Sequence, residues 1–207
     1  MTLAGVTFLL VVTVLESLAS SYSVHRNTIS DLLALGTRTA WAGEPLLFLA
    51  GLAWIAGAYY LYRGTGSRGE MILNILPGAG LLLAVLSPEN VNVVVHSVGA
   101  VLAFVPGPLA AILSYRRIES AFRYFALALG VRSLASVGIE FGAYSTPLVQ
   151  ATLGGGGWER AIVYPLLIWL IGYGSYLLAP AARVVDERTP IPPAMSPESG
   201  RGVRDPT

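Results

Sequence analysis

The sequence contains neither cysteine nor lysine among its 207 residues. The missing cysteines exclude disulfide bonds, thiolate metal sites and a cysteine nucleophile. Because all 13 basic residues are arginine, a Schiff-base lysine and a phosphate-binding loop that ends in lysine are also excluded. Any site in this protein therefore depends on arginine, histidine, carboxylates and neutral polar groups.

Charge of either sign is also scarce. Charged residues make up 12% of the chain, against about 25% in an ordinary soluble domain. Hydrophobic residues make up 54%, and the mean hydropathy is +0.64. The formal net charge of +1 provides no basic surface for nucleic acid. The composition predicts a membrane protein that contacts membrane lipids, does not bind nucleic acid and has an undetermined oligomeric state.

Six apolar segments are long enough to cross a bilayer, which takes about 20 mostly apolar residues in a helix. They lie roughly at residues 2–19, 42–62, 70–86, 91–115, 122–143 and 158–179. The first segment lacks the basic flank of a signal peptide, so we expect it to remain in the protein. The sequence therefore predicts an all-α, polytopic transmembrane bundle of about six helices within residues 1–180.

The arginines predict how this bundle is oriented. Five of them fall in the loops near residues 63–68 and 116–123, on the same side as the tail, and three fall on the other side. Since arginine-rich loops stay inside, both termini of this multi-pass cell-membrane protein are expected in the cytoplasm. Residues 181–207 contain five prolines and mixed charges, and they should form a disordered cytoplasmic tail.

The fifth segment contains small residues and one central charge. Gly138 and Gly142 form a G-x-x-x-G motif, and Gly130 extends the same four-residue spacing. Small residues at this spacing let membrane helices approach closely. Arg132 lies near the middle of the segment, where a charge has to reach the interface or pair inside the bundle.

Two of the predicted helices contain internal prolines. Pro106 and Pro108 lie inside the fourth segment, and Pro165 lies inside the sixth. Proline removes a backbone donor and its ring clashes with the preceding turn, so both helices are expected to kink.

Carboxylates gather on the side of the membrane opposite the arginine-rich loops. Six acids lie there, together with both histidines: Glu16, Asp31, Glu44, Glu89, Glu140 and Glu159. Acidic residues obey the topology rules only weakly. Their accumulation therefore points to a polar cluster on the outer face, and three local groups of residues carry it.

The first group lies in the loop between the first two segments. Thr28 and Asp31 have the spacing of a capping box, which predicts a short interfacial helix at about residues 29–35. Capping alone explains Asp31. His25 and Arg26 precede this helix and have no such role, so they either belong to a site or contact solvent and head groups.

The second group begins the fourth segment. Ser87 is expected to cap the helix, with Pro88 at its first position. Glu89, Asn92 and His96 would then share one face that enters the bilayer. A histidine about two turns inside a span needs a polar partner, whether it is a structural residue or part of a site.

The third group begins the sixth segment, after a run of four glycines at residues 154–157. Glu159 suits the positive end of a helix, whereas Arg160 does not. We expect Arg160 to pair with an acid from another group, Asp31 or Glu89, or to bind an anion. The alternative is that it extends outward to water.

Taken together, the three groups resemble an uncharacterised family of prokaryotic membrane proteins, the domain of unknown function 998. The resembling stretches are residues 22–32, ending in Asn-Thr-Ile-Ser-Asp-Leu, residues 87–97, with Ser-Pro-Glu-Asn and His-Ser, and residues 157–169, beginning Gly-Trp-Glu-Arg. The similarity spans most of residues 3–180. It implies a six-helix bundle and no particular activity, since the family is named for lacking one.

One candidate function is a binding or catalytic site on the outer face. Its candidate catalytic residues are His25, Asp31, Glu89 and His96, and its candidate ligand-binding or anion-binding residues are Arg26, Glu159 and Arg160. Two histidines and carboxylates could bind Zn²⁺, whose bound water would hydrolyse a lipid-like substrate. Without a metal, a histidine would act as the general base.

Two other functions compete with this site. A small carrier would use Arg132 and the outer acids along a polar path, although no inverted repeat is evident. A structural or accessory subunit would use the same polar groups only to tie loops together. The two histidines distinguish these cases, because a metal or catalytic site requires His25 and His96 within about 5 Å of each other and of a carboxylate.

Overall fold

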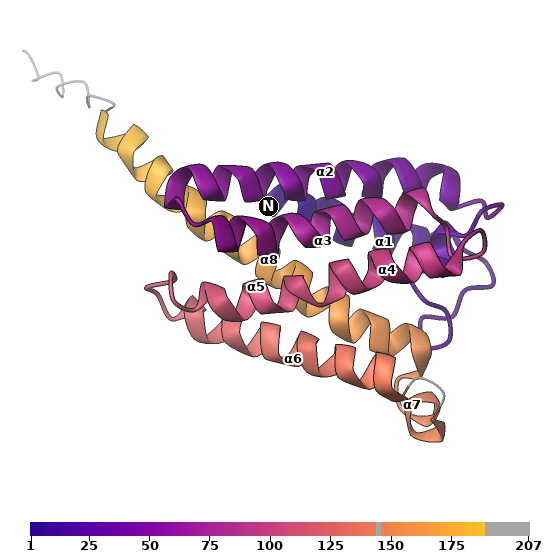
Figure 1. The fold of residues 1–207 in the computed structure, drawn as a ribbon. Coiled ribbons are helices and arrows are strands. Elements are labelled where there is room, and N and C mark those ends of the chain that lie inside the picture. Colours follow the sequence, from indigo (N-terminus) through magenta and orange to yellow (C-terminus); the bar gives the residue numbers. More distant parts are fainter. Residues whose placement is uncertain (144–145, 189–207) are drawn as a thin grey trace, which may run out of the picture.

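The structure, a computed structural model, describes residues 1–143 and 146–188, without the side chains of residues 148 and 180–188. The described residues form helices and no strand (Figure 1). In chain order the helices are α1 (Thr2–Leu18), η1 (Ser30–Leu33), α2 (Ala40–Thr65), α3 (Arg68–Leu86), α4 (Val93–Phe104), α5 (Pro106–Ser114), α6 (Phe122–Ala143), α7 (Pro147–Ala151) and α8 (Gly154–Arg188).

Five helical stretches are long and apolar enough to cross a membrane. They are Ala40–Thr65, Arg68–Leu86, Val93–Ser114, Phe122–Ala143 and Gly154–Ala179. The 17-residue α1 is also apolar but shorter. Large apolar side chains project from the surface, with Trp41 79% and Tyr60 73% exposed, as suits contact with lipid. The predicted all-α membrane bundle of about six helices is confirmed.

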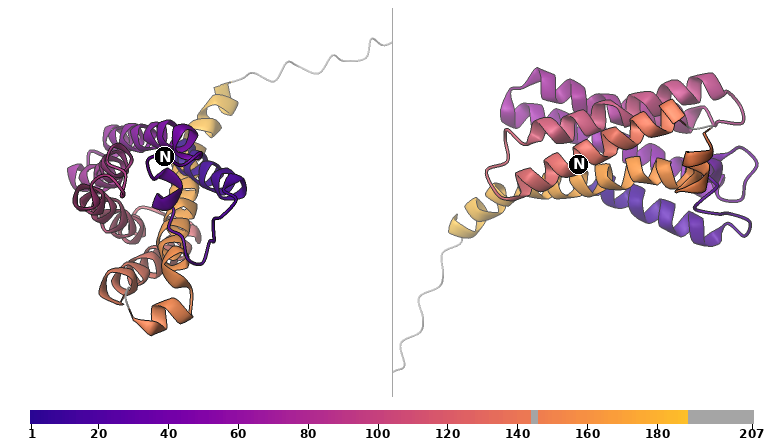
Figure 2. Two further views of the ribbon diagram at one scale, coloured as in Figure 1. Left: turned by 90° about the vertical axis from the view of Figure 1, so that its right-hand side faces the viewer. Right: turned by 90° about the horizontal axis from the view of Figure 1, so that it is seen from below.

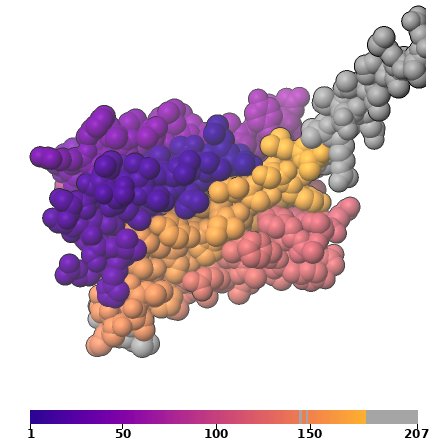
Figure 3. All heavy atoms as spheres, turned by 180° about the vertical axis from the view of Figure 1, so that it is seen from behind, coloured from indigo at the N-terminus to yellow at the C-terminus, as the bar shows by residue number. Residues whose placement is uncertain are grey.

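The helices are arranged around α8. Figure 2 shows α1 to α4 as an arc, with α8 crossing its open side and α6 packed beyond it. Seen from behind, α8 lies between α1 and α6 (Figure 3). Its side chains Ile162, Trp169 and Leu170 are completely buried. The core therefore forms where α8 meets the arc.

The two ends of the bundle differ in charge. We call one end the acidic end: it comprises the loop of residues 19–39, the turn of residues 87–92, and the start of α8 with the connection before it. The opposite end, with the loop of residues 115–121 and the turn between α2 and α3, is called the arginine end. Figure 1 shows the acidic end on the right and the arginine end on the left.

Prolines affect two helices differently. The predicted fourth helix breaks where α4 ends at Phe104 and α5 begins at Pro106, so the kink expected there is present. In contrast, α8 continues through Pro165 without interruption. It also continues to Arg188, past the domain boundary expected at residue 180. Residues 189–207 of the expected tail lie outside the described residues.

The start of α4 differs from its prediction. The expected cap at Ser87 is wrong, because Asn92 caps the helix by accepting a hydrogen bond from the Val95 amide at 3.1 Å. Pro88 belongs to a turn before the helix, in which its carbonyl oxygen accepts from the Asn92 amide at 3.0 Å. His96 therefore lies in the first turn of α4 and not two turns inside it.

Glycines on α6 pack in two different ways. A Cβ added at Gly130 would lie 2.9 Å from backbone atoms of Pro108 and Ile112 on α5, so this glycine allows close helix contact. A Cβ at Gly138 or Gly142 would meet nothing within 4 Å. Within the described residues, the predicted close packing is thus correct for Gly130 and wrong for the G-x-x-x-G pair.

A close approach between two helix backbones joins α3 and α4. A Cβ on Gly80 would lie 2.5 Å from the Gly99 oxygen and from the Ala103 nitrogen. A Cβ on Gly99 would lie 2.7 Å from the Ala84 nitrogen. Because these neighbours are backbone atoms, they cannot move aside as a flexible side chain can.

We predict that Gly80→Ala lowers the free energy of unfolding by about 2 kcal/mol or more, as overpacking between two backbones does. Gly69→Ala, in the first turn of the same helix, is the control because a Cβ there meets nothing within 4 Å. It should be neutral or slightly stabilising, since alanine favours helix. Unfolding in mixed micelles measures both, and equal effects would contradict the close contact.

Candidate functional site

A buried arginine near the start of α8 joins three segments at the acidic end. Arg160 is 4% exposed. Its Nε and Nη2 atoms donate to Glu16 Oε1 on α1 at 2.8 and 2.7 Å. Its Nη1 atom donates to the carbonyl oxygens of Val24, Asn27 and Gly156 at 3.2, 3.0 and 2.6 Å. This one guanidinium connects α1, the first loop and α8.

Tyr22 accepts the remaining Nη2 donor of Arg160. Its hydroxyl donates in turn to the Thr28 carbonyl oxygen at 2.6 Å. Burial raises the pKa of Tyr22 to about 12, although Arg160 acts in the opposite direction. The phenol therefore stays protonated at neutral pH and continues to donate. All five N–H groups of Arg160 have acceptors inside the protein, which leaves none for an external anion.

Convergence of the three groups is confirmed, but the expected partner of Arg160 is wrong. Arg160 pairs with Glu16, and not with Asp31 or Glu89. Glu16 lies in the last turn of α1, and α1 packs beside α8, so the two charges meet by helix packing over a separation of 144 positions. No short-range motif in the sequence marks that contact.

Asp31 has the capping role that the spacing predicted. The Thr28 amide donates to Asp31 Oδ2 at 2.9 Å, and the Asp31 amide donates to Thr28 Oγ1 at 3.2 Å. This is a reciprocal capping box. The helix that it starts is η1, a 3₁₀ turn at Ser30–Leu33, and is shorter than the expected residues 29–35.

The η1 turn is held from two sides. The Ile29 amide donates to the buried carboxyl group of Glu159 on α8. Ser30 Oγ donates to Glu89 Oε2, in the turn between α3 and α4, at 2.9 Å. Glu159 and Glu89 therefore position the first loop across the acidic end.

His96 binds the end of α3. Its Nδ1 atom lies 3.2 Å from the Ala84 oxygen and 3.1 Å from the Ser87 oxygen. Both neighbours are acceptors, so Nδ1 carries the proton and satisfies carbonyls that the helix end leaves open. In the neutral ring, Nε2 is then a hydrogen-bond acceptor.

His25 lies elsewhere, against the start of α8, where its carbonyl oxygen accepts from the Gly156 amide at 3.2 Å. A Cβ on Gly156 would meet the Val24 oxygen at 2.6 Å, so only glycine fits this contact. Arg26 beside it is exposed. Across residues 1–143 and 146–188, no group of three His, Asp or Glu side chains is placed to bind a metal ion. A zinc site built from His25 and His96 finds no ligand set there.

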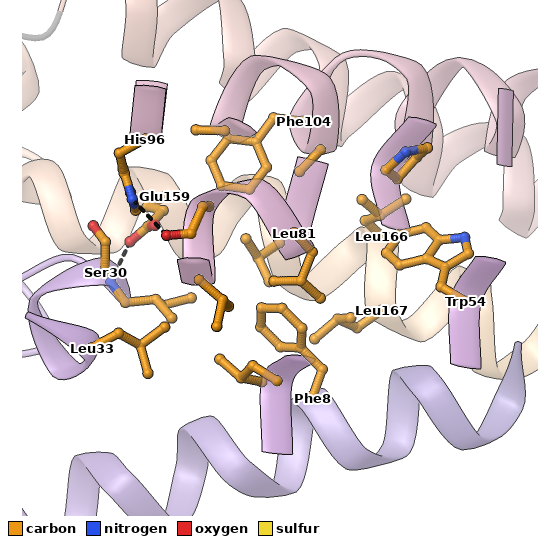
Figure 4. Close-up of a pocket in the computed structure, with 18 residues that line it drawn as sticks. Phe8, Ser30, Leu33, Trp54, Leu81, His96, Phe104, Glu159, Leu166 and Leu167 are labelled. Carbon is orange, nitrogen blue, oxygen red and sulfur yellow. Dashed lines mark hydrogen bonds between the residues drawn. The ribbon is translucent and has the colours of Figure 1, made fainter. Parts of the chain in front are cut away.

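A cavity of about 70 Å³ lies inside the bundle at the acidic end (Figure 4). Apolar side chains from α1, α2, α3, α4 and α8 form most of its wall, including Phe8, Leu47, Trp54, Leu81, Phe104 and Leu166. Figure 4 shows Ser30, His96 and Glu159 grouped at one end, away from Trp54. The cavity is thus apolar along its length and polar at one end.

A second, more open pocket of about 290 Å³ adjoins that polar end. The two pockets share Ser30, His96, Ala100, Phe104 and Glu159. The open pocket adds Glu89 and Glu140, together with Thr28, Ser97 and Phe141, and so lies between α4 and α6. We call it the mouth. It brings together three carboxyl groups, and no arginine of the described residues lines it.

Glu140 is the residue of the mouth that the sequence reasoning left without a role. Its Oε2 atom is buried and has no hydrogen-bond partner among the described residues. In contrast, Glu159 accepts a hydrogen bond from the Ile29 amide, and Glu89 accepts one from Ser30 Oγ. The signal available in the sequence was the only carboxylate of the fifth segment, which lies in its last turn.

A comparison with protein families shows which family this chain belongs to. It belongs to the family described as "Protein of unknown function (DUF998)". The family model matches residues 2–176, which covers every residue of the cavity and the mouth. No curated protein and no solved structure matches the chain. The family resemblance noted in the sequence is confirmed, and it supplies no activity.

We predict that Arg160→Ala and Glu16→Gln each destabilise the protein by about 3 kcal/mol, because each leaves a buried partner unpaired. The double variant should cost clearly less than the sum of the two. Glu89→Gln should instead be close to additive with Arg160→Ala, since the two side chains share no hydrogen-bond partner. Unfolding in mixed micelles measures this cycle, and strict additivity with Glu16→Gln would contradict the buried pair.

Proposed function

We propose that the cavity and its mouth bind an amphiphilic molecule that enters from the membrane between α4 and α6. The observation that carries this proposal is the continuity of an apolar cavity with a polar mouth, through the residues that the two share. Ligand sites in proteins are mostly apolar with a few placed polar groups, as here. The apolar chain would lie along Phe104 and Leu81, with the head group at the mouth.

The carboxyl groups of the mouth favour a cationic or hydrogen-bond-donating head group. Glu89, Glu140 and Glu159 supply acceptors, and His96 Nε2 adds another. An anionic head group would meet these carboxyl groups without a compensating arginine. Arg160 is saturated by internal acceptors, which speaks against the anion-binding role considered for it.

The alternative is a structural or accessory subunit without catalysis. It is supported by the internal use of most polar groups at the acidic end, above all Arg160 and Asp31. The free Oε2 atom of Glu140 favours binding instead, because a buried acceptor without a partner costs stability unless something fills the role.

We predict that an amine with a short alkyl chain, brominated at its end, quenches Trp54 fluorescence in lipid nanodiscs, because Trp54 lines the small cavity at the end away from the mouth. The quenched component should be missing in Trp54→Phe. The same chain with a sulfate head should bind at least about tenfold more weakly, a difference of roughly 1.4 kcal/mol. Ala100→Phe, placed where the two pockets join, should abolish binding of either.

Glu140→Gln should weaken amine binding about tenfold, within the range for a hydrogen bond to a charged group. Glu44→Gln is the matched control. Glu44 Oε1 is also buried without a partner, and Glu44 lines neither pocket. Equal binding of amine and sulfate, or equal effects of the two glutamine variants, would contradict an amphiphile site with an acidic mouth.

We also propose that the acidic end faces outward and that both termini are cytoplasmic, because arginine-rich loops stay inside. The site would then take its ligand from the outer leaflet. We predict that a cysteine at the exposed Gly64 is protected from an impermeant maleimide in intact cells, whereas a cysteine at the exposed Ser21, in the first loop at the acidic end, is labelled. The cysteine-free sequence makes each signal specific. The reverse pattern would place the site on the cytoplasmic side.

A further inference from the structure

One charged side chain lies on the exposed surface of a membrane-spanning helix, far from both helix ends. Arg132 is exposed near the middle of α6, one of the five stretches apolar enough to cross a membrane. Of the two alternatives expected for it, reaching the interface or pairing inside the bundle, the second does not occur among the described residues. Within the described part of the chain, its side chain takes part in no ion pair and no hydrogen bond.

The side chain of Arg132 cannot easily reach the membrane surface at either end of α6. It lies ten residues from Phe122 and eleven from Ala143, the two ends of α6. At about 1.5 Å per residue, each end is roughly 15 Å away, which is farther than an arginine side chain extends. A charge at this depth is costly unless it meets an opposite charge or water.

Among the residues with described side chains, none of the acids forms an ion pair with Arg132. Glu140 lies eight residues further along the helix, about 12 Å toward the acidic end. It faces the mouth and is not on the exposed face. The ion pairs of the described residues join Arg117 to Glu70 and Arg160 to Glu16, both away from this face.

The surface around Arg132 is shaped for close approach. Small exposed residues lie beside it at Ala128, Ala135, Gly138 and Gly142. A Cβ at either glycine would meet nothing within 4 Å, so no other described residue covers these two positions. Small residues in such a row let another helix approach until side-chain and backbone contacts form.

We propose that this face of α6 binds a membrane-spanning helix of a second protein that carries Asp or Glu near the middle of the bilayer. The carboxylate would pair with Arg132, and the glycines would admit the helix backbone. The charge identifies the partner, because a purely apolar helix would leave Arg132 unpaired.

A second copy of this chain does not fit the same face. In a two-fold dimer within a membrane, both copies have the same orientation, so Arg132 would lie at the depth of Arg132 in its neighbour. Like charges at that depth repel. The partner is therefore a different protein.

The test uses three synthetic single-span helices of leucine and alanine, with Asp, Asn or Leu at the centre, and energy transfer to the labelled full-length protein in phosphatidylcholine vesicles. The wild type should bind the Asp helix about tenfold more tightly than the Leu helix, as expected for a polar pair in a bilayer. Arg132→Leu should remove this preference. Gly138→Leu should weaken binding of all three helices, because the larger side chain would keep a helix backbone away from this face.

Two further variants make the result specific. Arg123→Leu, in the first turn of α6, should bind like the wild type. Arg132→Asp should reverse the preference and favour a helix with a central Arg. Thermal unfolding of each variant in detergent confirms that it folds.

Three outcomes would overturn the proposal. The first is equal binding of the Asp and Leu helices by the wild type. The second is energy transfer between two labelled copies of the protein that Gly138→Leu abolishes, which would make the face a self-association surface. The third is loss of the Asp preference when phosphatidylglycerol is added, which would assign Arg132 to anionic lipid.

Discussion

The buried guanidinium of Arg160 constrains the whole acidic end of the protein. A charge removed from water is tolerated only when its donors are satisfied, and Arg160 has five of them. Glu16, Tyr22 and three backbone carbonyl oxygens supply the acceptors. Because these groups come from α1, the first loop and α8, satisfying one side chain fixes three separate segments.

The first turns of α8, which contain Arg160, also border the proposed site. Glu159 precedes Arg160 and accepts the Ile29 amide, so the loop that Arg160 holds is also the loop that borders the cavity. Ser30 then reaches Glu89, and His96 secures the end of α3 on the other side. The mouth remains open between α4 and α6, beside these contacts. One carboxyl oxygen of Glu140 in the mouth has no hydrogen-bond partner among the described residues.

Local patterns predicted local structure well here. Apolar runs located the helices, Thr28 and Asp31 formed their capping box, and the chain did break before Pro106. The predictions failed where contacts between residues far apart in the sequence determine the structure. Asn92, and not Ser87, caps α4, so His96 lies in the first turn of the helix. Glu16 meets Arg160 only because α1 packs on α8, a contact that no spacing in the sequence reveals.

The central claim is that the guanidinium geometry, and not merely a positive charge, holds the first loop over the cavity. Hydrogen exchange in Arg160→Lys tests it most directly, because lysine keeps the charge but has three donors in place of five. The amides of residues 24–33, Ile29 above all, should exchange at least about tenfold faster, a loss of roughly 1.4 kcal/mol of local protection. Amides in the middle of α2 and α3 should keep their protection. Unchanged protection at Ile29 in Arg160→Lys would contradict the account.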